Sequence, residues 1–313
     1  FMDQSDLKKI NLFIPGAAKS GTSSLHELLN LHPEINMSKN KEPHFISSEP
    51  EIINSTIAIQ KYLENFDFTK KYSYRGESST GYFYFEKFKD NFFELVNPNS
   101  KFILILRNPI DRTYSHYNYL KSLGSETEDL ETAVLKDHEK EPSSEDLLPE
   151  LIIKNYYQYS LYGKWLKRFL EHFDAKNVKI ILFEDLKNNQ LETINSCFEF
   201  LGIQPLENLK EVTSNKTVKV RFPQLYRRMR VFMFNKSKTS EIVKHLFPAK
   251  FRRKYKKKAT EILLSVLKTK KPLPQISDKE RAFLRNLYKD DVLLLQQITG
   301  LKFTSWQDFY KAS

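Results

Sequence analysis

Short continuous apolar runs alternate along this chain with longer stretches of helical periodicity. The runs "INLFIP" (10–15), "KFILIL" (101–106) and "VKIILF" (178–183) predict buried strands. Elsewhere apolar positions recur three or four residues apart, which predicts helices over residues 22–31, 110–122, 156–173, 189–201 and 278–298. Buried strands that alternate with helices are typical of an α/β fold, in which helices cover both faces of a central parallel sheet.

Two stretches depart from this alternation. Residues 124–149 are acidic and polar, and we expect an exposed insertion there. Residues 224–268 have a helical and basic character. We expect one domain over 1–313, with a basic, mainly helical segment at 219–271 and a helical C-terminal part at 278–313.

The formal net charge of +11 is concentrated in the segment 219–271. This segment holds 18 Lys and Arg against two acids, Glu241 and Glu261. It could face nucleic acid, an anionic glycan or an anionic membrane surface. A solvated helix face beside a site for an anionic ligand explains the charge equally well.

The chain contains one cysteine, Cys197, in the apolar stretch "TINSCFEFLG". A single cysteine excludes an intrachain disulfide and a cysteine-based zinc site, and its position favours a buried small side chain over a nucleophile. No apolar run approaches the 18 residues that span a membrane, and the first residues lack the apolar core of a signal peptide. We expect a cytoplasmic protein and leave peripheral membrane association open.

The stretch "LFIPGAAKSGTSSLHELL" (12–29) places a glycine-rich loop between a predicted strand and a predicted helix. Gly16 and Gly21 have the spacing of a phosphate-binding loop, but Thr22 follows Gly21 where nucleotide triphosphatases have a lysine. The lysine of this loop is Lys19, inside it. Such a lysine can neutralise a bridging oxygen without magnesium, which fits the transfer of a group less charged than phosphoryl, such as sulfuryl.

A second anion-binding stretch, "LRNPIDRTYSHY" (106–117), follows the strand at 101–106. Arg107 lies at the carboxyl end of that strand, where ligands of open α/β sheets bind. Arg107 offers a planar fork of donors and Ser115 offers a hydroxyl. Together they could bind a second phosphate, so that a nucleotide with phosphates at both ends of its ribose would bridge the two stretches.

The two stretches together resemble the sulfotransferases that use 3'-phosphoadenosine 5'-phosphosulfate. "PGAAKSGTSSL" is similar to the 5'-phosphosulfate loop of that family, and "LRNPIDRTYSHY" to its 3'-phosphate motif. The stretches "KEPHFIS" (41–47), "SLYGKWLKRFLEHF" and "FEDL" extend the resemblance, and the carbohydrate-acting, heparan-sulfate-type branch is the most similar. The resemblance implies a three-layer, P-loop-like fold.

The resemblance also implies roles for individual residues. Lys19 would contact the phosphosulfate bridge, while Ser20, Gly21, Thr22 and Ser23 would bind the 5'-phosphate. Arg107 and Ser115 would bind the 3'-phosphate. In "SNKTVKVRF" (214–222), Lys219 and Arg221 are further candidates for the 3'-phosphate. No metal is implied.

The acceptor side is predicted from "KEPHF" (41–45). Glu42 and His44 alternate, so in an extended segment their side chains would face the same way. The resemblance implies Glu42 as the base that removes the acceptor proton and His44 as its helper. If Glu42 is not the base, His44 and His116 are the next candidates. Without the resemblance, a surface loop with an ion pair from Lys41 or Lys39 to Glu42 explains the stretch. Carbohydrate-acting relatives often have a lysine where this chain has Ser78, and an aspartate where it has Ser47.

We therefore expect sulfuryl transfer from 3'-phosphoadenosine 5'-phosphosulfate to a hydroxyl, less readily an amine, of a glycan, glycolipid or other small acceptor. Adenosine 3',5'-bisphosphate would be the second product, and no nucleic acid partner is expected. Two alternatives stay open: a magnesium-dependent small-molecule kinase, and a non-enzymatic polyanion binder that uses 219–271. The sequence does not indicate the acceptor or the oligomeric state.

Overall fold

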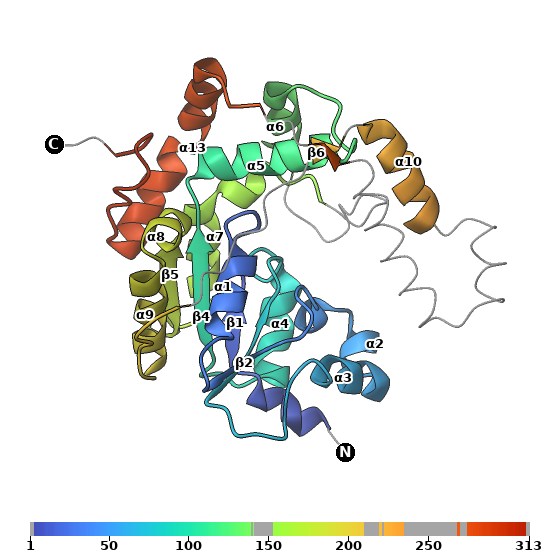
Figure 1. The fold of residues 1–313 in the computed structure, drawn as a ribbon, viewed down its shortest axis with the longest axis vertical. Helices are drawn as coiled ribbons and strands as arrows, with labels where there is room; N and C mark the ends of the chain where they lie inside the picture. The colour runs from blue at the N-terminus through green and yellow to red at the C-terminus, as the bar shows by residue number, and fades with distance from the viewer. Residues whose placement is uncertain are drawn as a thin grey trace. The chain divides into compact units, whose positions relative to one another are not determined.

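Figure 1 shows the computed structural model, which describes residues 3–138, 140, 153–209, 219–220, 222–234, 268–269 and 274–310. Two compact units can be distinguished along the chain. Unit 1 comprises Phe1–Arg112, Tyr159–Asn215 and Arg285–Ser313, and unit 2 comprises Thr113–Gln158 and Lys216–Leu284. The central sheet belongs to unit 1, and so does the glycine-rich loop at residues 15–21, which is called the phosphate loop below.

Five strands of unit 1 form one parallel sheet in the order β2-β3-β1-β4-β5. The predicted runs form β1 (Leu12–Ile14), β4 (Lys101–Leu106) and β5 (Val178–Leu182). The sequence pattern missed β2 (Ile35–Met37) and β3 (Tyr74–Ser78). Strand β1 lies between β3 and β4, so the chain that leaves its carboxyl end emerges where the strand order reverses, which is where open α/β sheets bind ligands.

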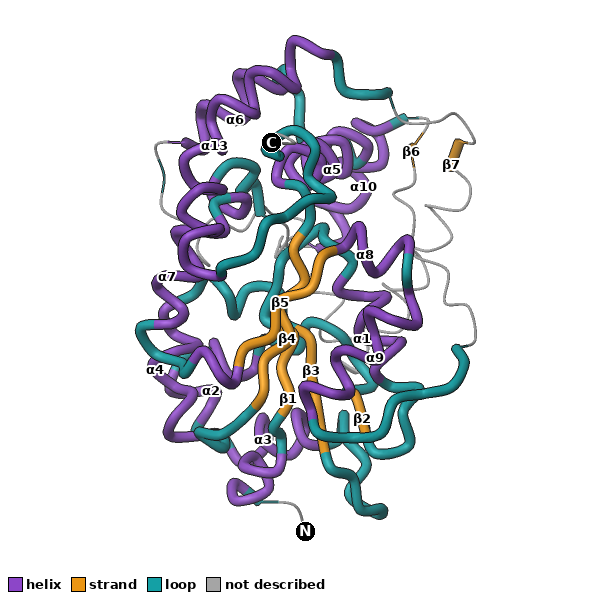
Figure 2. Tube along the Cα trace, turned by 90° about the vertical axis from the view of Figure 1, so that its left-hand side faces the viewer, coloured by secondary structure: helices purple, strands orange, loops and turns teal. Residues whose placement is uncertain are grey.

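Helices cover both faces of this sheet (Figure 2). Figure 2 shows α1 and α9 on one side of the strands and α4 and α7 on the other. The helices, in chain order, are α1 (Thr22–Leu29), α2 (Pro50–Ile53), α3 (Thr56–Leu63), α4 (Glu86–Leu95), α5 (Pro109–Ser122), α6 (Leu130–His138), α7 (Tyr162–Leu170), α8 (Phe183–Asn188), α9 (Gln190–Leu201), α10 (Pro223–Phe234) and α13 (Asp278–Thr299).

The alternation of side chains along β1 and β4 builds two different cores. Leu12, Ile14 and Ile105 belong to an aliphatic cluster with residues of α1 and α9. Phe13 and Phe102 face the other way, and their rings pack with the phenylalanines of α4 and α7, as in the 5.6 Å contact of Phe13 with Phe92. Both faces of the sheet are therefore buried, as the continuous apolar runs predicted, and the three-layer, P-loop-like α/β fold is confirmed.

Several expectations about single segments can be compared with the structure. Cys197 is fully buried in α9, as predicted, and burial raises the pKa of its thiol to about 12. The prediction of an exposed insertion at 124–149 is wrong for its first part, because Leu130, Val134 and Asp137 of α6 are buried. Residues 139 and 141–149 lie outside the described part. Helix α1 begins directly after Gly21, with Thr22 as its first residue, as the predicted start at residue 22 requires.

The second unit contains α6, α10 and most of α5, together with a two-stranded antiparallel pair. Strand β6 (Lys219–Val220) pairs with β7 (Lys268–Thr269). Helix α10 covers the first part of the basic stretch predicted to be helical at 224–268, whereas residues 235–267 lie outside the described part. The long amphipathic helix expected at 278–298 is α13.

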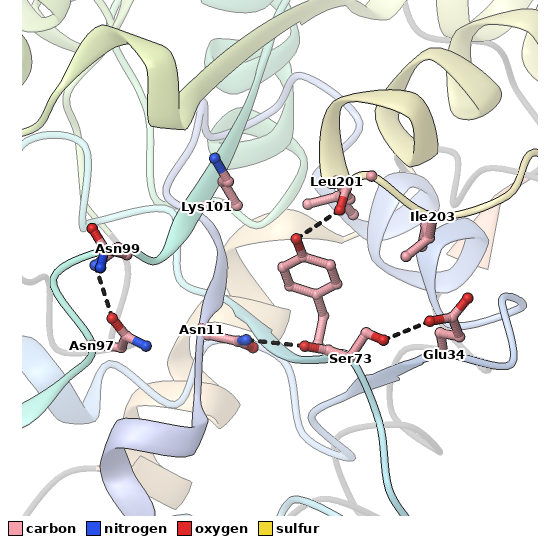
Figure 3. A pocket seen from close by; sticks show the side chains of 10 residues that line it. Asn11, Glu34, Ser73, Asn97, Asn99, Lys101, Leu201 and Ile203 are labelled. Carbon is pink, nitrogen blue, oxygen red and sulfur yellow. Dashed lines mark hydrogen bonds between the residues drawn. The ribbon is translucent and has the colours of Figure 1, made fainter.

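A hollow of about 400 Å³ opens at the edge of the sheet opposite the phosphate loop (Figure 3). Several of its polar side chains already have partners: Ser73 Oγ donates to Glu34 Oε2, and the Tyr74 hydroxyl donates to the carbonyl of Leu201 at 2.7 Å. It lies at the amino ends of β1, β3 and β4, away from the carboxyl ends at which open α/β sheets bind ligands. The candidate site therefore lies at the opposite edge, where the carboxyl ends of the strands meet.

Candidate active site

Backbone hydrogen bonds hold the loop between β1 and α1 on both sides. The amide of Ala17 donates to the carbonyl of Ile105 at 2.8 Å, and the amide of Ile105 donates to the carbonyl of Gly16 at 3.0 Å. On the other side the amide of Phe83 donates to the carbonyl of Pro15 at 3.0 Å. The loop is thus fixed to the end of β4 and to the residues that follow β3.

Gly21 closes this loop in a conformation that requires glycine. Its φ angle is 92°, and a Cβ atom there would lie 2.6 Å from Cδ2 of Phe183. Helix α1 begins immediately afterwards, so that its first N–H groups and the positive end of its dipole face the loop. A strand, a tight loop and a helix N-terminus in this order form an anion-binding site.

Two arginines hold successive carbonyl groups of the loop. Arg107 follows β4 and donates through Nη1 to the carbonyl of Lys19 at 3.4 Å. Arg112 is completely buried and donates through Nε to the carbonyl of Ala18 at 3.1 Å and through Nη1 to Ser160 Oγ at 3.0 Å. Sequence reasoning did not single out Arg112, although it is the second arginine of the quoted stretch "LRNPIDR".

The loop is strongly electropositive. Burial, followed by the charges of Arg112 and Arg107, lowers the pKa of Lys19 from 10.5 to about 8. The hydroxyl of Ser20 is buried and has no hydrogen-bond partner among the described residues. Three clustered cations, a buried hydroxyl and a helix N-terminus favour a ligand that carries negative charge.

The end of β4 is fixed by residues far away in the sequence. Glu184, in the stretch "FEDL", accepts the backbone N–H of Asn108 at 2.9 Å and the indole N–H of Trp306 at 3.0 Å. The guanidinium of Arg107 lies 4.9 Å from the ring centroid of Phe183, at the start of α8. Arg107 is therefore positioned by β4, α8 and the residues after α13.

The remaining predicted contacts for the 3'-phosphate belong to unit 2. Ser115 lies half-buried in α5, and His116 beside it is buried against the ring of Tyr156. Lys219 is the first residue of β6. Arg221 lies outside the described residues. The roles of these residues remain predictions.

Glu42 is the centre of a hydrogen-bonded cluster beside the loop helix. Its Oε1 accepts from Lys41 Nζ at 2.8 Å, and its Oε2 accepts the backbone N–H of Thr80 at 2.8 Å. His44 Nε2 lies 3.1 Å from the same Oε2. Lys41 Nζ also donates to Thr22 Oγ1 at 3.0 Å, which joins this cluster to the first residue of α1.

The backbone brings Glu42 and His44 together in a way that the sequence did not predict. Their φ angles are 56° and 51°, so the segment turns through left-handed conformations and is not extended. Lys19 is left-handed as well, with a φ of 68°. Non-glycine residues pay strain in this region, and such strain gathers at functional sites.

The cluster keeps Glu42 ionised. Burial raises the pKa of this carboxyl, but the hydrogen bond from His44 and the charge of Lys41 outweigh burial and lower the pKa to about 2. About a third of the side chain is exposed, so the carboxylate is open to solvent. The ion pair from Lys41 to Glu42, which the alternative interpretation as a surface loop also predicted, is present, and it lies beside the phosphate loop.

A buried carboxylate, Glu77, supports this cluster from below. Its oxygens accept hydrogen bonds from the hydroxyls of Tyr62 (2.7 Å), Tyr82 (2.8 Å) and Ser79 (2.6 Å). Ser79 Oγ in turn accepts the backbone N–H of His44 at 3.1 Å. Glu77 was not predicted, because a glutamate in a short polar stretch gives no sign that it will be buried.

Ser78, where the resemblance led us to expect a lysine, makes a contact with a neutral side chain. Its hydroxyl lies 2.8 Å from Nδ1 of His26. Burial, followed by the charge of Lys41, lowers the pKa of His26 to about 4, so this ring is uncharged at neutral pH. Ser47 donates its hydroxyl to the carbonyl of His44 at 3.1 Å.

In the part of the chain that the structure describes, no group of three or more His, Cys, Asp or Glu is placed to hold a metal ion. None of the described helices is both long enough and apolar enough to cross a membrane.

Comparison with known proteins identifies relatives of this architecture. Human carbohydrate sulfotransferase 15 is 23% identical over 265 residues, which cover 66% of this chain and 46% of that protein. Mouse heparan sulfate glucosamine 3-O-sulfotransferase 5 is 25% identical over 202 residues, which cover 61% of this chain and 53% of that protein. The chain spans about half the length of these curated relatives.

A solved structure has the same fold. The sulfotransferase from Alicyclobacillus acidocaldarius matches 95% of this chain and 98% of its own, with a TM-score of 0.63 and 22% identity. The family described as "Sulfotransferase domain" matches residues 9–262 of this chain. This range includes the phosphate loop, Glu42, Arg107 and Arg112. The chain belongs to the sulfotransferase domain family, as the stretches at 12–29 and 106–117 indicated.

Proposed function

We propose that this protein transfers a sulfuryl group from 3'-phosphoadenosine 5'-phosphosulfate to a hydroxyl of a carbohydrate or a similar acceptor. The observation that carries the proposal is the electropositive loop beside an ionised carboxylate. Lys19, Arg107 and Arg112 provide positive charge where the helix N-terminus also favours an anion, and Lys41 links Glu42 to the first residue of that helix.

The residues present suit the donor. Its 5'-phosphosulfate would lie in the loop, where Ser20, Gly21, Thr22 and Ser23 would bind the phosphate through hydroxyl and backbone N–H groups. Its 3'-phosphate would extend toward Arg107, with Ser115, Lys219 and Arg221 as the further ligands implied by the motifs. The buried hydroxyl of Ser20 would gain a partner in this way.

The transfer would be an in-line displacement. The acceptor oxygen forms a bond to sulfur while the bond from sulfur to the bridging phosphate oxygen breaks, and the acceptor proton passes to Glu42. The negative charge that develops on the departing phosphate lies beside Lys19, and His44 stabilises the glutamate in position. No magnesium takes part in this scheme.

The acceptor is proposed more broadly. The relatives named above act on carbohydrates by their names, which favours a carbohydrate acceptor, and we propose a glycan or glycolipid hydroxyl, less readily an amine. The basic segment 219–271 suits an anionic acceptor or an anionic membrane surface. We propose a cytoplasmic site of action, in keeping with the lone buried cysteine.

Calorimetric titration tests the donor directly. Adenosine 3',5'-bisphosphate without metal should bind, and ATP with magnesium should bind much more weakly. The reverse order would overturn the proposal in favour of a kinase. Binding should be followed by transfer of 35S from labelled donor to a panel of non-sulfated glycans.

Exchange of Glu42 for Gln tests the base. The variant keeps the shape of the side chain and should retain bisphosphate affinity within about twofold, whereas transfer should fall by about 100-fold or more. Unchanged transfer would move the base elsewhere, with His44 and His116 next.

A further inference from the structure

Lys41 occupies a position that the proposed reaction does not yet use. It lies directly before Glu42, and its ammonium bridges two parts of the site: it donates to Thr22 Oγ1 at 3.0 Å and to Glu42 Oε1 at 2.8 Å. Thr22 opens the helix at the phosphate loop, and Glu42 is the proposed base. The two partners are 20 residues apart in the chain, so only the fold creates this bridge.

The transferred group has to lie in the same place. In the donor, one bridging oxygen joins the sulfonate to the phosphate that the loop binds. The acceptor approaches sulfur from the side opposite to that oxygen, and the base must be within hydrogen-bond reach of the acceptor. On the proposed function, the sulfonate would therefore lie between the loop and Glu42, where the Lys41 ammonium bridges Thr22 and Glu42.

We propose, on the basis of the proposed function, that Lys41 binds the sulfonate of the donor and carries positive charge at the transferred group. An ammonium has three N–H donors, and two of them are used by Thr22 and Glu42. The side chain is 25% exposed, so the third donor is within reach of a ligand. A hydrogen bond from an ammonium to a sulfonate oxygen is charge-assisted.

The surroundings of Lys41 agree with this assignment. Ser78 contributes a neutral hydroxyl bonded to His26, and that ring is uncharged at neutral pH. Lys41 also contributes to the low pKa of Glu42, so its charge acts on the base as well as on the sulfonate. When the ammonium shares its charge with the sulfonate, less of it stabilises the carboxylate, and the carboxylate becomes a better base.

The two nucleotides of the proposed reaction provide the test. The donor carries the sulfonate and adenosine 3',5'-bisphosphate does not, while both carry the same phosphates. Calorimetric titration of the intact chain with each nucleotide, without acceptor and in the cold, isolates the contribution of the sulfonate. Lys41→Met removes the charge and keeps the length of the side chain.

We expect Lys41→Met to weaken donor binding by about tenfold or more and bisphosphate binding by less than about twofold, because one charge-assisted hydrogen bond is lost only with the donor. Lys41→Arg should restore part of the donor affinity. Lys39→Met is the matched control, because Lys39 is exposed two residues earlier and its Nζ donates to the carbonyl of Glu64. It should change neither affinity.

Equal losses for both nucleotides, or no loss for either, would overturn the assignment of Lys41 to the sulfonate. If the unaltered protein binds neither nucleotide, the proposed function itself fails. The two failures are therefore distinguishable. Circular dichroism of Lys41→Met should match that of the unaltered protein, and a variant that does not fold would be replaced by Lys41→Gln in the same titrations.

Discussion

The lowered pKa of Lys19 makes nucleotide binding depend on pH in a calculable way. In the unbound protein this pKa is about 8 and not the ordinary 10.5. Keeping Lys19 charged in its buried, cationic surroundings at neutral pH therefore costs about 3 kcal/mol, at 1.36 kcal/mol per pH unit. A bound phosphate offsets the two guanidinium charges and restores the pKa toward its ordinary value.

Binding should accordingly take up a proton above pH 8. Between pH 8 and about 10 the bisphosphate affinity should fall by nearly tenfold per pH unit, so that Kd at pH 9.5 is about 30-fold larger than at pH 7. The ligand does not cause this change, because its phosphates have already ionised near pH 6. Arginines do not titrate in this range.

Calorimetry in buffers of different ionisation enthalpy measures both the affinity and the protons taken up. Lys19→Met should bind weakly at pH 7 and show a much flatter dependence on pH. A flat profile in the unaltered protein, or the same slope in both proteins, would refute the reasoning. The unbound variant should also be more stable at pH 7 by up to about 3 kcal/mol, and this gain should shrink as pH rises from 8 to 10.5, because the native lysine is then neutral.

Two further predictions concern stability. Glu77→Ala leaves three buried hydroxyls without their acceptor and should lower the free energy of unfolding by about 3 kcal/mol or more. Glu77→Gln keeps an acceptor oxygen and should retain most of the free energy of unfolding. Equal losses for the two variants in urea unfolding would contradict the role of the carboxylate as acceptor. Gly21→Ala combines a left-handed φ with a clash against Phe183. The variant should lose about 2–3 kcal/mol of the free energy of unfolding and should also bind the bisphosphate more weakly. Gly300→Ala is the control, because Gly300 has a φ of 69° with open space around it. This variant should lose about 1 kcal/mol of the free energy of unfolding and should keep its bisphosphate affinity. Similar losses in both variants would show that the contact with Phe183 is unimportant.

The sequence by itself determined the elements whose signal is local. Continuous apolar runs predicted β1, β4 and β5; both faces of β1 and β4 are buried, and β5, at the edge of the sheet, is buried at its carboxyl end. Glycine spacing placed the loop, and Arg107 was found because it follows a buried strand. Cys197 was correctly expected to be buried, since it lies on the apolar face of a helix.

Tertiary structure alone decided the contacts that make the site. Strand β3 includes Arg75, Gly76 and Glu77 and pairs through its backbone, which leaves no apolar pattern to detect. Left-handed backbone conformations bring Glu42 and His44 together, whereas the prediction from their alternation assumed an extended segment.

The bridge from Lys41 to Thr22, the buried Arg112 against the loop, and the contact of Glu184 with Trp306 join residues 19, 94 and 122 positions apart, respectively. Periodicity describes how a residue relates to its neighbours in the chain and not to partners that only folding brings near. For this reason the sequence indicated the chemistry of the loop, while the fold decided which charges surround it.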